Sequence, residues 1–443
     1  MSVEESFWTR LERKGYGWIR WVLVVGCLVT AGEEAGAQAD YKRFYDEDNL
    51  PRVKRVFQAG GYDLVIQVCD YSLQRGQPSW EWRTLRFQAL TAVGRYEDAV
   101  AEALETTRRF PDELGALLEA YELFTELGRV EDAARMLNGI NNAASAVPKR
   151  DRTAIDYVRL GRAALVLGAD PAKVLDQYFG AAKEFEAKGE EVPEGLVEAY
   201  LAAGQLALEK DDYGRAADEF RAGLKFVPDH PELLFGLAES FAPDNRKRSN
   251  TYLQQVLEEA PIHFGALFLI AENSITYEQY GEAEEALVQV ESVNARHPKL
   301  HAYRAILAEL ERNDRVEFEA LRERALSIWE NNPEIDFLIG AVLSRKYRHE
   351  EGAESQRRAL KMDPDFLPAK LQLALDYLRL GEVEKAWPLV DEVGAVDEYN
   401  VLALTSRCCA RNSRGLLAWK QITLSFACLR LMLKSTETGF LSS

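Results

Sequence analysis

The sequence predicts an all-α solenoid of about ten helix-turn-helix units, and three observations support this prediction. Prolines that end helical segments recur every 31 to 37 residues. They are Pro228, Pro261, Pro298, Pro333 and Pro364. Gly94 and Gly128 are 34 residues apart, as are Ala99 and Ala133. Apolar residues at helical spacing, with turn signals roughly every 15 to 20 residues, indicate helix pairs without strands.

Length and composition fit one long array and exclude some functions. The 443 residues contain 47% hydrophobic and 28% charged residues, which is ordinary globular composition. The net charge is −18, whereas a general nucleic-acid binder needs clustered positive charge. Five cysteines in a chain of this length cannot form a disulfide framework.

Residues 1–39 are predicted to be a signal peptide or another N-terminal targeting segment. Basic residues precede the short apolar run 21–31, and the small residues 35–37 follow it. This order is typical of a secretory signal cleaved after Ala37 or Ala39, and the run is short for a membrane span, which needs about 20 apolar residues. We expect an exported bacterial protein, periplasmic or extracellular. An uncleaved anchor and a cytoplasmic protein are the alternatives.

Residues 40–399 carry the repeat. The unit that ends at Pro228 has aromatic, small and apolar residues in a regular order: Tyr200, Ala203, Gly204, Ala216 and Phe220. We expect Gly204 and Ala216 to be small because the two helices cross there. Two units are looser, since residues 151–187 show no clear turn glycine and residues 246–260 place Asn250 near the alanine position.

This pattern resembles the tetratricopeptide repeat (TPR), a helix-turn-helix unit of 34 residues. The resemblance covers roughly four-fifths of the chain and implies a right-handed superhelix in which neighbouring units bury each other's apolar faces. It also implies that the first helix of each unit lines a concave groove. It does not identify a ligand, because one fold serves many functions.

Residues 400–443 differ from the array. They contain six basic residues and one acidic residue, Glu437, together with Cys408, Cys409 and Cys428. Three interpretations are open: a helix that caps the array, a basic amphipathic segment that touches a membrane surface, or a truncated or out-of-frame end without an evolved role. Membrane contact is expected only through this tail or the N-terminal segment.

Catalytic and cofactor motifs are missing from the sequence. It contains no phosphate-binding glycine loop, nucleophile elbow, C-x-x-C or H-E-x-x-H. His297 and His301 are spaced like a zinc pair on a helix, but Pro298 stands between them. We therefore expect surface histidines at a repeat junction, with no metal, no cofactor and no enzymatic activity.

The implied groove suggests a row of ligand contacts on successive first helices. The same register falls on Gln205, Glu239, Glu272 and Glu309, with Phe235, Phe268 and Ile306 nearby on these faces. Negative charge beside apolar contacts favours a basic protein or peptide and disfavours an acidic peptide. Chance solvation in an acidic chain is the alternative explanation of these glutamates.

The sequence thus predicts a non-catalytic scaffold that binds a protein or peptide, and not nucleic acid, in the groove of a TPR superhelix. The alternative is that the chain is the recognition half of a TPR-containing metallopeptidase whose catalytic domain is absent. Residues 396–403 resemble the junction that leads from such an array to a gluzincin-type domain. Without an H-E-x-x-H this chain could not perform the hydrolysis.

Overall fold

The computed structural model describes residues 50–76, 79–185, 192–397 and 399–401. Every regular element in these ranges is a helix, which confirms the predicted all-α fold. The targeting segment 1–39 and nearly all of the tail 400–443 lie outside the described residues. None of the described helices is long and apolar enough to cross a membrane.

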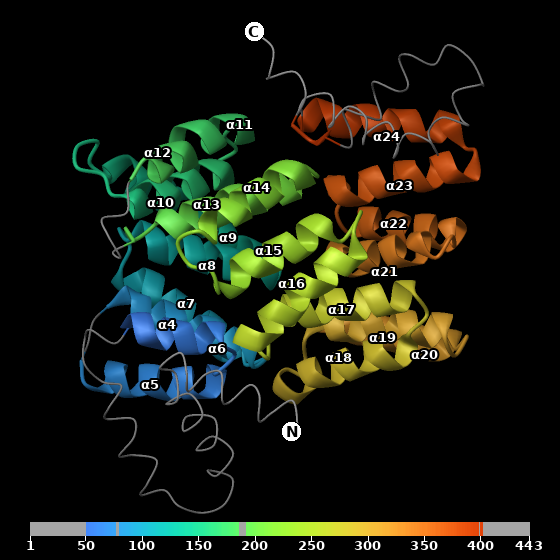
Figure 1. Cartoon of the computed structure of the whole chain (residues 1–443), viewed down its shortest axis with the longest axis horizontal. Helices are drawn as coiled ribbons and strands as arrows, with labels where there is room; N and C mark the ends of the chain where they lie inside the picture. Colours follow the sequence, from blue (N-terminus) through green and yellow to red (C-terminus); the bar gives the residue numbers. More distant parts are fainter. Residues whose placement is uncertain (1–49, 77–78, 186–191, 398, 402–443) are drawn as a thin grey trace, which may run out of the picture.

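The described helices form ten successive antiparallel pairs, numbered here as units 1 to 10 (Figure 1). The pairs are α4 (Leu50–Gln58) with α5 (Tyr62–Gln74), α6 (Trp80–Ala92) with α7 (Tyr96–Arg109), α8 (Leu114–Glu126) with α9 (Val130–Ala146), α10 (Ala154–Val166) with α11 (Pro171–Val174), η3 (Leu175–Phe179) and α12 (Gly180–Lys183), α13 (Leu196–Glu209) with α14 (Tyr213–Gly223), α15 (Pro231–Phe241) with α16 (Arg246–Glu259), α17 (Phe264–Thr276) with α18 (Tyr280–Val293), α19 (Pro298–Leu310) with α20 (Arg315–Ala325), α21 (Pro333–Arg345) with α22 (His349–Met362), and α23 (Leu367–Leu380) with α24 (Val383–Val396). In unit 4 the second helix is interrupted by the π-helical turn η3.

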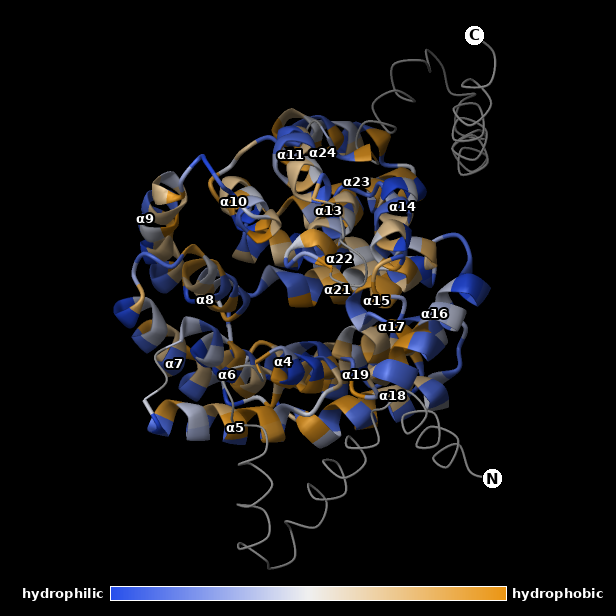
Figure 2. Cartoon of the chain, turned by 60° about the vertical axis from the view of Figure 1, so that its left-hand side comes forward, coloured by the Kyte–Doolittle hydropathy of each residue, from blue (hydrophilic) through white to orange (hydrophobic). Residues whose placement is uncertain are grey.

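Small residues let the two helices of a unit approach closely, as predicted for Gly204. A Cβ at Gly204 would overlap the ring of Phe220, which has no exposed surface. Ala216 is also fully buried. In α16 the buried small residue is Ser249, next to the expected Asn250. The same apolar packing continues from unit to unit, and Figure 2 shows apolar and polar residues sharing the same helices.

A left-handed residue ends the first helix in nine of the ten described units. In unit 3 the N–H of Arg129 donates to the carbonyl oxygen of Phe124 at 2.7 Å, which satisfies a carbonyl left open at the helix end. Unit 4 has the same geometry at Gly168, with φ of +83°. The expectation that residues 151–187 lack a turn glycine was therefore wrong. The left-handed residues are Gly60, Gly94, Gly128, Gly168, Asp211, Glu278, Asn313, Tyr347 and Gly381.

First helices form the inner layer of the array. Each first helix contacts the first helix of the next unit, from α4 and α6 through to α21 and α23, whereas successive second helices make few contacts or none. This difference bends the array so that the first helices lie inside the curve. The arrangement places the predicted ligand residues, all of which belong to first helices, on the inner layer.

The curvature brings distant units together along a line that we call the seam. It consists of the turns inside units 1, 2, 3 and 5 and the segments that pack on them about 190 to 200 residues later. Three of these segments are inter-unit loops, and the fourth is the segment that follows unit 10. Units 1 to 5 are called coil 1 and units 6 to 10 coil 2. In Figure 1 the blue helices of coil 1 accordingly lie beside the yellow helices α17 to α20.

Candidate functional site: an acidic inner face

The predicted row of polar ligand residues lies on four successive first helices. Gln205 on α13 is exposed, while Glu239 on α15 and Glu272 on α17 are half-buried. Glu309 on α19 is 8% exposed. The register predicted from the sequence therefore places these residues on one layer, but their surroundings differ from unit to unit.

The predicted apolar contacts pack mainly against neighbouring units. The ring centroids of Phe235 and His263 are 4.8 Å apart, and those of Phe268 and His297 are also 4.8 Å apart. Phe235 is half-buried and Phe268 is 6% exposed. Ile306 has no exposed surface, so it is a core residue and has nothing to offer a ligand. Of the three, Phe235 retains the most accessible surface.

Arginines from unit 9 neutralise two of the predicted glutamates. The Arg345 guanidinium lies 2.9 Å from a carboxylate oxygen of Glu272, which also accepts a 2.7 Å hydrogen bond from the Tyr303 hydroxyl. Arg348 lies 2.7 Å from Glu309. Arg345 comes from two units further along the chain than Glu272, and Arg348 comes from the unit that follows Glu309, so contacts between units supply both partners.

Glu239 occupies the same register, but its carboxylate makes no hydrogen bond or ion pair with any described residue. Burial, reinforced by the negative charge of Glu232, raises the pKa of Glu239 from its ordinary 4.5 to about 7. The charges of Lys299 and His263 offset part of this rise. Glu239 is therefore a carboxylate held in a position where its ionised form is costly.

Sequence reasoning missed further carboxylates beside this row. Glu122 and Glu126 lie on α8, and Glu209 ends α13. Desolvation by the surrounding helices is the largest cause of a raised pKa at all three, although each residue keeps exposed surface. Arg162 donates to Glu122 at 2.6 Å, whereas Glu126 and Glu209 make no ion pair with a described residue.

These carboxylates lie close enough for their charges, and those of nearby residues, to shift one another's pKa values, so we treat them as one surface. The charges of Lys299 and Glu334 act on Glu126, that of Glu209 acts on Glu122, and that of Lys299 acts on Glu239. We define the acidic inner face as Glu122, Glu126, Glu209, Glu239, Glu272 and Glu334. Four of these carboxylates lack an ion pair with any described residue, and Lys299 is the one unpaired cation whose charge is seen to act among them.

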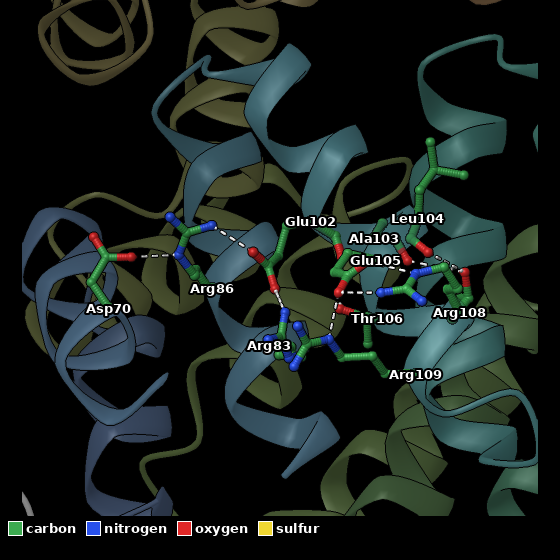
Figure 3. Close-up of polar contacts among 11 residues, drawn as sticks. Asp70, Arg83, Arg86, Glu102, Ala103, Leu104, Glu105, Thr106, Arg108 and Arg109 are labelled. Carbon is green, nitrogen blue, oxygen red and sulfur yellow. Dashed lines mark hydrogen bonds and ion pairs between the residues drawn. The ribbon is translucent and has the colours of Figure 1, made fainter. Parts of the chain in front are cut away.

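The carboxylates of units 1 and 2 that Figure 3 shows are paired with arginines, unlike several carboxylates of the acidic inner face. Arg86 lies between Asp70 and Glu102, with distances of 2.6 and 2.8 Å, and Arg83 also bonds Glu102. On α7, Glu105 pairs with two arginines of the following turn. Each of these carboxylates has a basic partner, in contrast to Glu126, Glu209 and Glu239 of the inner face.

His297 and His301 were predicted to be surface residues, and this was wrong for His301, which is 2% exposed. His297 is the N-cap of α19, where its Nδ1 accepts from the N–H of Lys299 at 3.2 Å. Burial lowers the pKa of His297 to about 3. Both side chains serve helix packing, and no cluster of potential metal ligands occurs among the described residues.

The segment after unit 10 returns to coil 1. Asp397 lies 2.7 Å from the Lys210 ammonium, the Asn400 amide donates to Asp211 at 3.0 Å, and the N–H of Val401 donates to the carbonyl of Lys210 at 3.0 Å. Asp397 and residues 399–401 therefore form the last contact of the seam. Their resemblance to a junction before a metallopeptidase domain stays a prediction.

The helix pairing, the crossing glycines and the turn geometry are those of a TPR-like helical repeat. No family model matches the sequence, and no curated protein matches it. Solved structures with a similar helix arrangement include yeast Tom70, at 14% identity, 88% of this chain, 96% of that chain and a TM-score of 0.42. The human IFIT1 dimer with PPP-AAAA matches at 15% identity, 78% of each chain and a TM-score of 0.39. A tetratricopeptide repeat protein from Parabacteroides merdae matches at 18% identity, 59% of this chain, 98% of that chain and a TM-score of 0.40.

Proposed function

We propose that this chain is a non-catalytic scaffold that binds a protein or peptide segment rich in lysine or arginine on its acidic inner face. The observation that carries the proposal is Glu239, a half-buried carboxylate without an ion pair whose pKa is raised to about 7. An unpaired carboxylate in such a place costs folding free energy, and such local costs concentrate at functional sites.

A cationic partner relieves this cost. The ammonium or guanidinium groups of a peptide pair with Glu126, Glu209 and Glu239, which have no cationic partner among the described residues of the free protein. The pairs are held by charge-assisted hydrogen bonds. The accessible part of the Phe235 ring supplies an apolar or cation–π contact beside Glu239. Acidic peptides and nucleic-acid phosphates are repelled by the same face.

Not all of the predicted row contributes equally in this proposal. Glu272 and Glu309 already bind Arg345 and Arg348, so they act mainly in positioning. Gln205 is exposed and uncharged, which suits it to hydrogen bonding with a peptide backbone. We further propose, from the sequence of residues 1–39 alone, that the scaffold works outside the cytoplasm, where its partner is also found.

The test is a calorimetric titration of the full chain with a lysine-rich peptide, a length-matched acidic peptide and a neutral one. Glu239→Gln is compared with Glu285→Gln, which removes the same charge from an exposed position of the outer helix α18. We expect the basic peptide alone to bind, with affinity reduced roughly three- to tenfold by Glu239→Gln and unchanged by Glu285→Gln. Equal binding by both variants, or preference for the acidic peptide, contradicts the proposal.

A further inference from the structure

The seam joins the two coils by small contacts at four places. The Tyr62 hydroxyl donates to the carbonyl of Ile262 at 3.2 Å, and the Asn294 amide donates to the Tyr96 hydroxyl at 3.0 Å. The other two places are the pair of Gly128 with Trp329 and the docking of Asp397 and residues 399–401 on unit 5. Each contact is made by a turn and a loop, and no helix of one coil lies along a helix of the other in these contacts.

One ion pair of the seam is exposed to solvent, whereas the Asn294–Tyr96 hydrogen bond and the Lys210–Asp397 pair are buried or nearly so. Arg296 reaches the carbonyl of Gly94 at 3.2 Å and the carboxylate of Glu97 at 2.9 Å, but the two side chains of the ion pair are 50% and 73% exposed. Exposed ion pairs add little stability and are screened by salt. Units 7 to 9 share one large apolar cluster, whereas the apolar contacts across the seam are limited to single side chains such as Ile328 and Tyr399, so the seam is the easier boundary to open.

The acidic inner face lies on both sides of the seam. Glu126 of coil 1 is two residues from Gly128, and Glu334 of coil 2 is five residues from Trp329. Because Gly128 and Trp329 are in contact, these two unpaired carboxylates are brought to the same place from opposite coils. Their like charges oppose closure of the seam, and Lys299, three residues after Arg296, offsets this repulsion in part.

We propose that a lysine- or arginine-rich segment bound to the acidic inner face bridges coil 1 and coil 2, so that ligand binding and closure of the seam are coupled. This inference rests on the proposed function. The bound cations replace repulsion between Glu126 and Glu334 with attraction to a shared ligand, which favours the closed seam. By thermodynamic reciprocity, any change that loosens the seam weakens binding, even at a residue that does not touch the ligand.

Arg296→Ala separates this coupling from simple charge effects. Removing a positive charge near the inner face would by electrostatics alone tighten the binding of a cationic peptide. Under the proposal the same substitution loosens the seam and weakens binding about two- to fivefold. Arg312→Ala is the control, because Arg312 is also an exposed arginine in ion pairs with glutamates but lies away from the seam.

The experiment combines titration of the full-length variants with hydrogen exchange of the unmodified full chain, with and without the lysine-rich peptide. We expect slower exchange in residues 91–97, 292–297 and 326–331 when the peptide is bound, and weaker binding by Arg296→Ala only. Peptide binding without seam protection, or with Arg296→Ala equal to or tighter than the unmodified chain, overturns this inference alone. Absence of binding by the unmodified chain overturns the proposed function and the inference together.

Discussion

Gly128, the turn glycine of unit 3, lies against the indole ring of Trp329 in the loop between units 8 and 9. A Cβ at Gly128 would overlap this ring, and φ there is +66°. Two independent features therefore require glycine at this position: the left-handed backbone conformation and the close approach of coil 2. The turns of units 7, 8 and 9 place Glu278, Asn313 and Tyr347 in the same conformation, and all three are exposed. Side chains are accommodated there because no other coil packs on these turns in the described structure.

Replacement of Gly128 by alanine is predicted to cost more than the same change at Gly168. Both have positive φ, so each substitution carries about 1–2 kcal/mol of left-handed strain. Nothing lies within 4 Å of a Cβ at Gly168, whereas at Gly128 the Trp329 ring must move. Urea unfolding should show an additional loss of about 1–2 kcal/mol for Gly128→Ala. Equal losses for the two variants would mean that the seam contributes nothing to stability.

Replacement of Glu239 by glutamine is predicted to stabilise the fold at alkaline pH. Because the folded pKa of about 7 lies above the ordinary 4.5, the folded chain holds a proton that the unfolded chain has released between these values. The contribution of Glu239 to stability is therefore present below pH 4.5 and is lost as pH rises through 7, up to about 3 kcal/mol. At pH 8 the thermal unfolding temperature of Glu239→Gln should be higher than that of the unmodified chain. This difference in unfolding temperature should disappear near pH 5. Glu285→Gln is the control, and a gap independent of pH contradicts the assignment.

His297 is predicted to make the fold sensitive to acid. Its folded pKa of about 3 lies below the ordinary 6.5, so the unfolded chain binds an extra proton between these values. Stability supplied by neutral His297 is complete above pH 6.5 and falls toward pH 3, on the order of 2–4 kcal/mol over the window. His297→Asn keeps an N-cap side chain, as Asn332 does for α21, and removes this titration. Between pH 7 and pH 4, the free energy of unfolding should fall less steeply with pH in the variant than in the unmodified chain. Identical pH dependence in the two proteins would contradict the prediction.

Removal of Arg345 is predicted to expose the second glutamate of the row. Arg345→Ala leaves Glu272 with the Tyr303 hydroxyl as its remaining hydrogen-bond partner among the described residues. Because the Arg345 side chain is 46% exposed, the loss of stability should be small, about 0.5–1 kcal/mol. Binding of a lysine-rich peptide should tighten, since an unpaired carboxylate is added to the acidic inner face. Calorimetry of Arg345→Ala beside Arg324→Ala, an exposed arginine of the outer helix α20, tests this, and weaker binding by Arg345→Ala would contradict it.

The sequence predicts local features of this protein well because each unit is encoded locally. The proline spacing, the packing of Gly204 against Phe220 and the placement of Glu239 on a first helix all depend on contacts within one unit or between neighbours. The partners Arg345 and Arg348 were not predicted. Arg345 reaches Glu272 from two units further along the chain, and the repeat pattern does not encode the side-chain placement that pairs Arg348 with Glu309 of the preceding unit.

The seam was likewise not predicted, since its contacts join residues about 190 to 200 positions apart. One signal in the sequence could have indicated it. Turn positions in units 1 to 3 are glycine, whereas those in units 7 to 9 are Glu278, Asn313 and Tyr347. In these six units, a change from glycine to a larger residue separates the covered turns from the uncovered ones. Asp211, which Asn400 contacts, and Gly168, which has nothing within 4 Å of a Cβ, do not follow this pattern.

Titration of the Glu239 carboxyl by carbon NMR, with and without a lysine-rich peptide, shows whether this carboxylate is unpaired in the free protein and binds a cation in the complex. Selective labelling of glutamate side chains and comparison with Glu239→Gln identify its signal. We expect a pKa of about 7 in the free protein and a clear fall in this pKa when the peptide is bound, because a cation then stabilises the ionised form. A free-protein pKa near 4.5, or a value of about 7 that saturating peptide leaves unchanged, would contradict it.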